Sequence, residues 1–151
     1  MSATRSGRTT WPDRLPLLAD TSAWSRAREP AVAAQWQDAL LAGRIVTFQP
    51  VVLEILRSPQ SPKAFDDLAD ALDSLRSLPL SDGLARAARA AMRELAGRGG
   101  AQHRIAPLDY LVAAAAAEHG AAVLHYDRHF DRLAEVLAFE SVWLAPSGSL
   151  P

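Results

Sequence analysis

The stretch LPLLADTSAW, residues 15–24, decides the fold because it joins a short apolar run to a carboxylate and two hydroxyl residues. The apolar residues predict a short buried strand, and aspartate is unfavourable inside a strand. Asp20 is therefore expected to end the strand. There it can accept hydrogen bonds from the free N–H groups of a following helix, or it can bind a metal ion at the edge of a sheet.

The rest of the chain predicts helices that alternate with strands. Three further strands are expected at RIVTF (44–48), AAVLHYD (121–127) and SVWLAP (141–146). Helical patterns, with prolines near their starts and glycines near their ends, are expected at 29–43, 49–58, 61–78, 81–100, 106–120 and 128–137. This alternation predicts an α/β protein with a mainly parallel sheet that helices cover on both faces.

Length and composition limit the classes of protein to consider. The chain has 151 residues, 49% of them apolar, which suits one globular domain, and its lack of cysteine excludes disulfides and thiolate metal sites. The net charge of −1 argues against bulk electrostatic binding of nucleic acid. Residues 1–14 lack the apolar segment of a secretory signal, so we expect a flexible leader, a domain over 15–148 and a cytoplasmic location.

Acidic side chains follow the ends of the predicted strands. Asp20 ends the first strand and Asp127 ends the strand AVLHY, while Asp109 lies in the first turn of the helix PLDYLVAA. Ligands of open α/β sheets collect outside the carboxyl ends of the strands. We therefore expect these side chains to approach one rim, with Glu54 reaching it from the helix after the second strand.

Each acid also has a purely structural explanation. The aspartates can cap helices or favour the helix dipole. Glu54 is harder to explain in this way, because its sequence neighbours are apolar and an unpaired buried carboxylate is costly. Four adjacent carboxylates repel one another, and a hard divalent cation relieves that repulsion. Such a site suits phosphodiester hydrolysis.

Several segments resemble the PIN-domain ribonucleases, and specifically the VapC-type toxins of bacterial toxin–antitoxin pairs. The matching segments are LLADTSAW, PVVLEILRS, HRIAPLDYLVAAAAAEHGAAVLHYDRHFDRLA and SVW, within about residues 15–145. Their order and spacing follow the family pattern of an early Asp-Thr/Ser, a Glu on an early helix, an Asp-x-x-Ile/Val-Ala-Ala helix and a late strand ending in Asp. The resemblance implies a PIN-domain three-layer α/β/α sandwich around a mainly parallel sheet.

The resemblance also implies an activity and partners. It implies an endoribonuclease that depends on Mg²⁺, for which Mn²⁺ can substitute, and that acts as a toxin. It implies an RNA substrate, a cognate antitoxin, a homodimer and no membrane partner. By position, the catalytic and metal-binding residues are Asp20, Glu54, Asp109 and Asp127, and the residues that support the first aspartate are Ser22 and Thr21.

The chain departs from the family pattern after its last acidic strand. Many relatives carry Asp-x-Asp-Phe there, whereas this chain reads DRHF, so that His129 replaces a second acid. A histidine at this place can bind a metal ion or a phosphate. The residues expected to contact RNA are Arg26, Arg57, Arg104 and His129.

Two alternatives to a nuclease remain open at the level of sequence. The first is a catalytically impaired PIN-like module that binds RNA or a protein, which the loss of the second acid at His129 favours. The second is a phosphoacceptor domain of receiver or haloacid-dehalogenase type, because both types place an aspartate at a strand end. Those types use a late lysine, and the single lysine here, Lys63, lies in a predicted middle helix.

Overall fold

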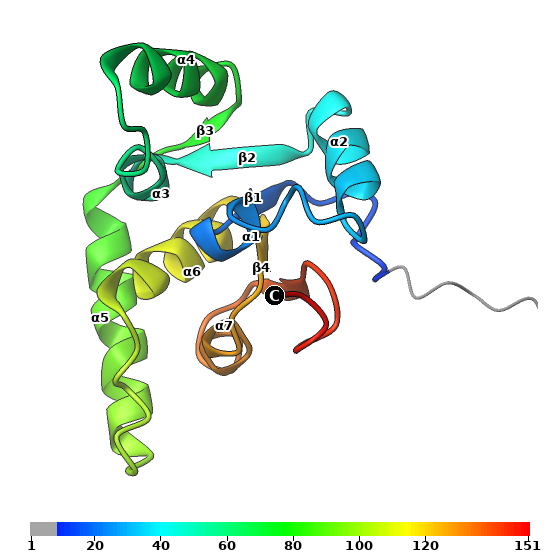
Figure 1. The fold of residues 1–151 in the computed structure, drawn as a ribbon. Coiled ribbons are helices and arrows are strands. Elements are labelled where there is room, and N and C mark those ends of the chain that lie inside the picture. The colour runs from blue at the N-terminus through cyan, green and yellow to red at the C-terminus, as the bar shows by residue number, and fades with distance from the viewer. Residues whose placement is uncertain (1–8) are drawn as a thin grey trace, which may run out of the picture.

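The computed structural model, which describes residues 9–151, contains a five-stranded parallel sheet (Figure 1). The strand order is β3-β2-β1-β4-β5, so that the first strand lies at the centre. All four pairings are parallel. The strands are β1 (Leu17–Ala19), β2 (Ile45–Phe48), β3 (Ser77–Leu78), β4 (Ala122–His125) and β5 (Glu140–Trp143). The predicted α/β class with a mainly parallel sheet is confirmed.

Helices connect the strands and cover the sheet. They are α1 (Thr21–Trp24), α2 (Ala33–Leu41), α3 (Gln49–Ile55), α4 (Pro62–Asp73), α5 (Asp82–Gly97), α6 (Pro107–His119) and α7 (His129–Leu133). In Figure 1, α5 and α6 pass side by side, and α2 lies on the opposite side of β1 from these two helices. No helix within residues 9–151 combines the length and the apolar character that crossing a bilayer requires.

Alternating side chains of the central strand divide the core into two clusters. Leu18 packs with residues of α5 and α6, whereas Leu17 and Ala19 pack with α2 and with the segment after β5. This alternation follows from the two-residue period of a strand. Helices therefore lie on both faces of the sheet, which confirms the three-layer sandwich.

Several predicted helices are shorter in the structure, and those predicted over 49–58 and 128–137 end at Ile55 and Leu133. The helix predicted over 61–78 ends at Asp73, and Ser77–Leu78 forms β3 at the edge of the sheet instead. Thr47 of β2 donates its backbone N–H to Arg76 O at 2.8 Å, so pairing with β2 replaces the helical hydrogen bonds. The helix predicted over 29–43 begins only at Ala33, because residues 25–32 form successive turns.

The packed part of the chain begins before the predicted domain boundary at residue 15. Trp11 is 3% exposed and belongs to the core cluster on the α2 side of the sheet. Gln35 of α2 donates a hydrogen bond to Thr9 O at 2.9 Å. Of the leader predicted over residues 1–14, residues 9–14 are thus part of the fold, and residues 1–8 lie outside the described residues.

Candidate active site

The carboxylates predicted from the sequence meet in one hollow at the carboxyl edge of the sheet. The hollow has a volume of about 310 Å³. Its walls come from the segment after β1, from α3 and from the beginnings of α6 and of the β4–α7 loop. They consist of Asp20, Thr21, Ser22, Ser25, Glu54, Ala106, Asp109 and Asp127. The structure therefore brings together all four acids that the sequence analysis singled out.

Asp20 both caps a helix and lines the hollow. It precedes α1, and its Oδ2 accepts hydrogen bonds from the backbone N–H of Ser22 at 3.0 Å and from the Ser22 hydroxyl at 2.6 Å. The side chain is buried, with 5% of the residue exposed. Burial raises the pKa of Asp20 above its usual value, although the hydrogen bonds from Ser22 act in the opposite direction. The cap and ligand interpretations of Asp20 are therefore compatible.

Ser22 connects the two strand ends that carry aspartates. Its hydroxyl donates to Asp20 and accepts the backbone N–H of Tyr126 at 3.0 Å. Tyr126 directly precedes Asp127 in the loop after β4. A single hydroxyl thus fixes the loop after β1 against the loop after β4. The sequence pattern predicts that Ser22 supports Asp20, but it gives no signal for the contact with Tyr126.

Among the four acids of the hollow, Asp109 has the most strongly shifted pKa. It lies in the first turn of α6, where the helix start presents it to the other acids. Burial, and to a smaller extent the negative charges of Asp20, Asp127 and Glu54, together raise the pKa of Asp109 to about 7. Among the described residues, no lysine or arginine forms an ion pair with any of the four acids. The hollow therefore carries negative charge that no lysine or arginine among the described residues offsets.

Asp127 is held in place from both sides. Its Oδ1 accepts the backbone N–H of His129 at 3.0 Å, and its own N–H donates to Nδ1 of His125 at 3.1 Å. The ring of His125 is fully buried, and burial lowers the pKa of His125 to about 4, so the ring is neutral at pH 7.

A chain of side chains continues from His125 to the edge strand. Nε2 of His125 lies 2.7 Å from the Ser141 hydroxyl, which donates to Asp131 at 2.7 Å. Because Nδ1 accepts a hydrogen bond, Nε2 carries the ring proton and donates a hydrogen bond to the Ser141 oxygen. The indole N–H of Trp143 also donates to Asp131 at 3.0 Å. The sequence does not predict this network; its only signal there is a histidine inside a strand, before the acid.

Glu54 is less buried than its sequence neighbours suggest. The residue is half-buried, and Leu53 beside it is 66% exposed. The side of α3 that carries Leu53 and Glu54 therefore reaches the protein surface. Oε2 of Glu54 accepts the hydroxyl hydrogen of Thr21 at 3.0 Å. The expectation of a buried setting for Glu54 is therefore wrong, although its carboxylate still lines the hollow.

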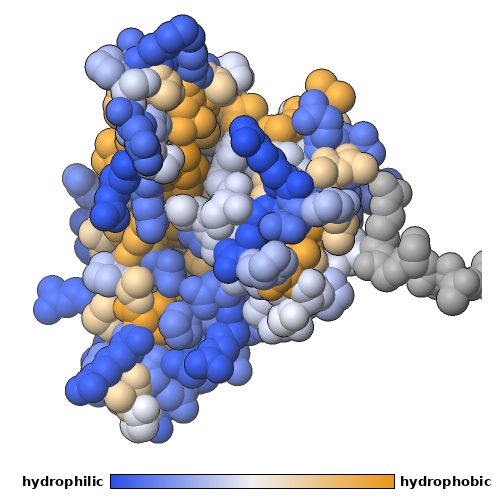
Figure 2. All heavy atoms as spheres, viewed as in Figure 1, coloured by the Kyte–Doolittle hydropathy of each residue, from blue (hydrophilic) through white to orange (hydrophobic). Residues whose placement is uncertain are grey.

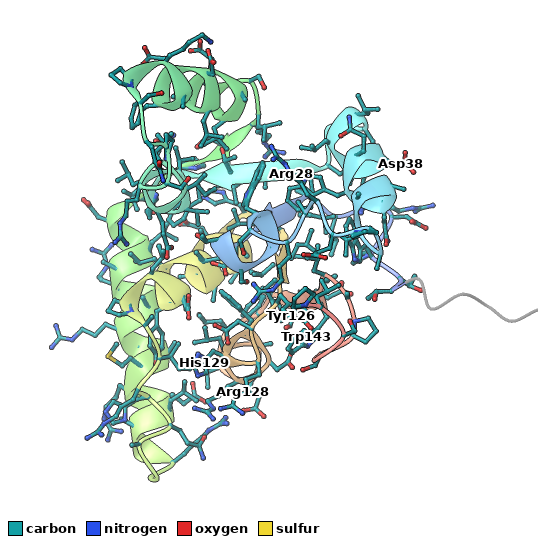
Figure 3. All side chains as sticks on the ribbon, viewed as in Figure 1. Arg28, Asp38, Tyr126, Arg128, His129 and Trp143 are labelled. Carbon is teal, nitrogen blue, oxygen red and sulfur yellow. The ribbon has the colours of Figure 1, made fainter. Side chains whose placement is uncertain are left out.

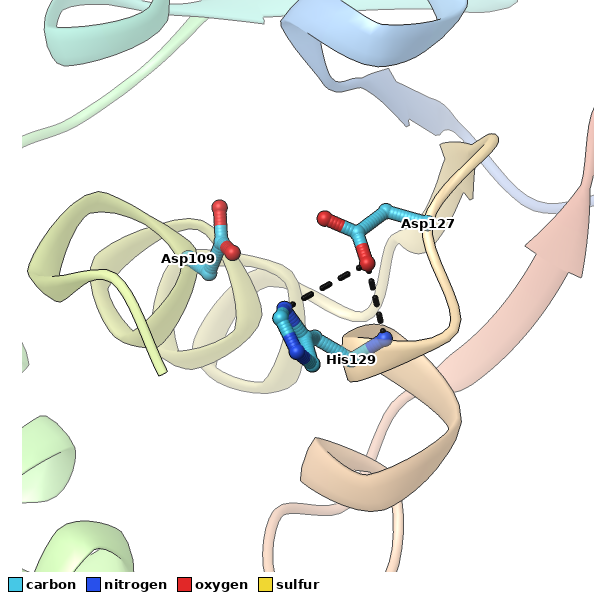
Figure 4. Close-up of side chains that lie close together, drawn as sticks. All are labelled: Asp109, Asp127 and His129. Atoms are coloured by element: carbon cyan, nitrogen blue, oxygen red, sulfur yellow. Dashed lines mark hydrogen bonds and ion pairs between the residues drawn. The ribbon is translucent and has the colours of Figure 1, made fainter. Parts of the chain in front are cut away.

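None of the arginines expected to contact RNA lines the hollow. Arg26 is engaged within the protein: it donates to Ser22 O at 3.0 Å and to Pro151 O at 3.2 Å, and its guanidinium lies 4.7 Å from the centre of the Tyr126 ring. Arg57 and Arg104 are exposed. The fourth candidate, His129, lies against Asp109 and Asp127 (Figure 4).

The donor set fits a hard divalent cation. Asp109, Asp127 and His129 each offer one ligand atom, and these atoms lie within 4.8 Å of one another. Asp20 and Glu54 add carboxylate oxygens to the same hollow. Mg²⁺ and Mn²⁺ prefer such oxygen ligands, and either cation would offset the negative charge of the hollow.

An apolar groove adjoins the acidic hollow. It has a volume of about 780 Å³ and lies between α1 and α2 on one side and α3 and α4 on the other. Figure 2 shows hydrophobic side chains in this region, framed by polar ones. Trp24 packs edge-on against Trp36 there, with ring centres 4.9 Å apart. The groove and the hollow share Thr21, Ser25 and Glu54.

Comparisons with known proteins agree with this geometry. A family model described as "PIN domain" matches residues 17–136. The chain is 42% identical to "Ribonuclease VapC18" of Mycobacterium tuberculosis over 132 residues, which cover 87% of this chain and 96% of that protein. It is 33% identical to "Ribonuclease VapC51" of the same organism over 136 residues, covering 90% and 98%.

Solved structures show the same fold at lower identity. The DNA-bound VapBC complex of Salmonella typhimurium superposes with a TM-score of 0.70 at 17% identity, covering 87% of this chain and 99% of the other. VapBC-5 of Mycobacterium tuberculosis gives a TM-score of 0.58 at 21% identity, covering 85% and 98%.

Proposed function

Because the chain belongs to the PIN domain family, we propose that it is a metal-dependent endoribonuclease and the toxin of a toxin–antitoxin pair. The names of its relatives support ribonuclease activity. The observation that carries the proposal is the meeting of Asp20, Glu54, Asp109 and Asp127 in one hollow without a lysine or arginine partner among the described residues. Such a hollow needs a cation, and a cation among carboxylates is suited to hydrolysis of a phosphodiester.

In the proposed mechanism, Asp20, Asp109 and Asp127 hold Mg²⁺ or Mn²⁺ and Glu54 lies at the rim. When bound, the cation offsets the charge of the phosphodiester and lowers the pKa of an attacking water. Ser22 keeps the Asp20 and Asp127 loops in register, and His125 holds the backbone of Asp127. The hydroxyl of Thr21 orients Glu54 so that its free oxygen can orient or deprotonate a water.

We also propose that the apolar groove receives the antitoxin. Structural neighbours of this chain are VapBC complexes, which pair a toxin with an antitoxin. The groove meets the hollow at Thr21 and Glu54, so an apolar segment seated in it would reach the acidic hollow and exclude RNA.

A homodimer remains a prediction, which light scattering of the purified chain checks.

Cleavage of RNA with matched variants tests the proposed activity. We expect purified wild-type protein to cut RNA with Mg²⁺ or Mn²⁺ and to stop when the cation is chelated. Asp20→Asn should lose at least 100-fold in rate, by the order of magnitude that removing a charge-stabilising group costs, whereas the same change at exposed Asp38 on α2 should leave the rate unchanged. Asparagine also caps helices well, so Asp20→Asn should remain folded.

The alternatives give different results in the same assay. A non-catalytic module would bind RNA with or without cation and cut under neither condition. Equal rates for Asp20→Asn and wild type would remove the proposed active site. The phosphoacceptor alternative lacks structural support, because Lys63 is an exposed residue of α4 that pairs with Asp67 at 2.6 Å.

A further inference from the structure

We propose that His129 binds the catalytic cation through Nδ1, and that this nitrogen ligand makes the site prefer Mn²⁺ to Mg²⁺. The inference rests on the metal-dependent function proposed above and adds a ligand that the acidic pattern does not contain. It concerns the position at which this chain departs from Asp-x-Asp-Phe. The departure would then change the chemistry of the metal site rather than abolish it.

The ring of His129 faces the gap between two carboxylates. Its Nδ1 lies 3.4 Å from Oδ1 of Asp127, and ligand atoms of His129, Asp109 and Asp127 lie within 4.8 Å of one another. Figure 4 shows the ring beside both aspartates, and Figure 3 shows it on the side of α7 that faces α6. An octahedral ion with bonds of about 2.1 Å needs neighbouring ligand atoms about 3.0 Å apart and opposite ones about 4.2 Å apart. Small side-chain shifts therefore suffice for one ion to contact all three residues.

The backbone fixes where the ring can go. The N–H of His129 donates to Oδ1 of Asp127 at 3.0 Å, so the residue is tied to the carboxylate two positions earlier, at the start of α7. The contact of Nδ1 with the same oxygen, at 3.4 Å, is too long for a good hydrogen bond. Its lone pair is therefore available to a cation when the proton lies on Nε2.

A nitrogen ligand changes which cation the site prefers. Mg²⁺ takes oxygen ligands almost exclusively and keeps several waters. Imidazole instead suits first-row transition metals better than it suits Mg²⁺, and Mn²⁺ is a first-row metal that also accepts carboxylates readily. Replacing a carboxylate by His129 should therefore weaken Mg²⁺ binding more than Mn²⁺ binding.

Pulsed electron paramagnetic resonance of the Mn²⁺-loaded full-length protein tests the ligand directly. A nitrogen bound to Mn²⁺ produces a ¹⁴N hyperfine coupling. We expect this coupling in wild type and its loss in His129→Asp, which restores an oxygen ligand and should still bind Mn²⁺. The matched control is His119→Ala, because His119 lies at the opposite end of α6 from Asp109, about 15 Å away at 1.5 Å per residue.

Calorimetric titration of Mn²⁺ and Mg²⁺ into the same proteins tests the preference. The ratio of Mn²⁺ to Mg²⁺ affinity should fall at least tenfold in His129→Asp and stay unchanged in His119→Ala. Mn²⁺ binding without nitrogen coupling would overturn the inference but leave the proposed nuclease intact, with His129 free to contact RNA. Nitrogen coupling that persists in His129→Asp would also overturn it. Failure of folded wild-type protein to bind Mn²⁺, with RNA present or absent, would overturn both.

Discussion

Without a cation, Asp109 is the acid of the hollow whose ionisation costs the most free energy. Its folded-state pKa of about 7 lies above the ordinary value of 3.8, so between these two pH values the native protein holds a proton there that the unfolded chain has released. The group therefore contributes stability below pH 4, and this contribution is lost as pH rises towards 7. Above pH 7 the ionised carboxylate destabilises the cation-free fold.

We predict that Asp109→Asn stabilises the cation-free protein at pH 8 while it abolishes cleavage. The whole pKa shift corresponds to about 4 kcal/mol at about 1.4 kcal/mol per unit. Because the side chain is half-buried, we expect about 1–2 kcal/mol in urea unfolding. The gain should vanish near pH 4, and Asp38→Asn should show none. A destabilised variant at pH 8 would contradict this account of the charge.

His125 has the opposite pH dependence. Its folded-state pKa of about 4 lies below the ordinary value of 6.5, so between these two pH values the native ring stays neutral while the ring in the unfolded chain is protonated. The stability that it contributes is full above pH 6.5 and is lost as pH falls towards 4. The effects of His125 and Asp109 partly cancel in wild type, so each must be measured against its own variant.

For His125 the comparison is with His125→Gln, which keeps a neutral polar side chain. We predict that wild type is the more stable protein at pH 7.5, by about 1–3 kcal/mol, because Asp127 and Ser141 lose well-placed partners in the variant. Urea unfolding should show that this advantage shrinks as pH is lowered to 4.5. An advantage that stays constant with pH would mean that the ring is not held neutral.

At the scale of elements, the site depends on two loops that one hydroxyl joins. Ser22 bonds Asp20 after β1 and the N–H of Tyr126 after β4, across 104 positions in sequence. Its removal leaves both groups short of a partner in a partly buried place. The two aspartates would then lose their common support.

We predict that Ser22→Ala costs about 1–3 kcal/mol of stability, which is the usual cost of unpaired polar groups. Cleavage should fall at least tenfold at a temperature where the variant is fully folded, because the two aspartates are no longer held in register. Ser74→Ala, at the exposed end of α4, serves as the control in the same unfolding and cleavage assays. An unchanged cleavage rate in folded Ser22→Ala would show that the loops keep their places without the hydroxyl.

The elements differ in how far the sequence predicts them. β1, β2 and β4 are fully buried and mostly apolar, and α6 combines an initial proline with Gly120 in the left-handed conformation at its end. Such elements carry strong local signals. β3 has only Ser77 and Leu78, and its pairing with β2 is a long-range contact that no local pattern encodes.

Side-chain environments follow the same rule. The meeting of the four acids follows from strand ends and helix starts, which the sequence marks. Phe65 of α4 and Leu53 of α3 are 43% and 66% exposed. These fractions depend on which other elements of the fold pack against the two helices. The bond from His125 to Ser141 depends on the pairing of β4 with β5. These features arise from tertiary packing and could not be read from residue spacing.

For the whole molecule, a bound cation should add stability that scales with its concentration. We predict that Mn²⁺ raises the melting temperature of wild type at pH 7.5, because it binds the folded hollow and not the unfolded chain. The gain should be about 2.7 kcal/mol at 100 times the dissociation constant. Thermal melts with Mn²⁺ and with chelator measure it, and Asp20→Asn should show a much smaller difference. Identical melts for wild type in both conditions would argue against a cation site in the free protein.

The most direct test of a metal ion held by these acids is the anomalous scattering of a crystal grown with Mn²⁺. We predict a strong anomalous peak among Asp20, Asp109 and Asp127, with bonds of about 2.1–2.2 Å to carboxylate oxygens. Crystals of Asp20→Asn grown in the same way should lose or weaken this peak. Well-ordered carboxylates without an anomalous peak, in a wild-type crystal that is active towards RNA, would show that the acids do not act through a metal ion.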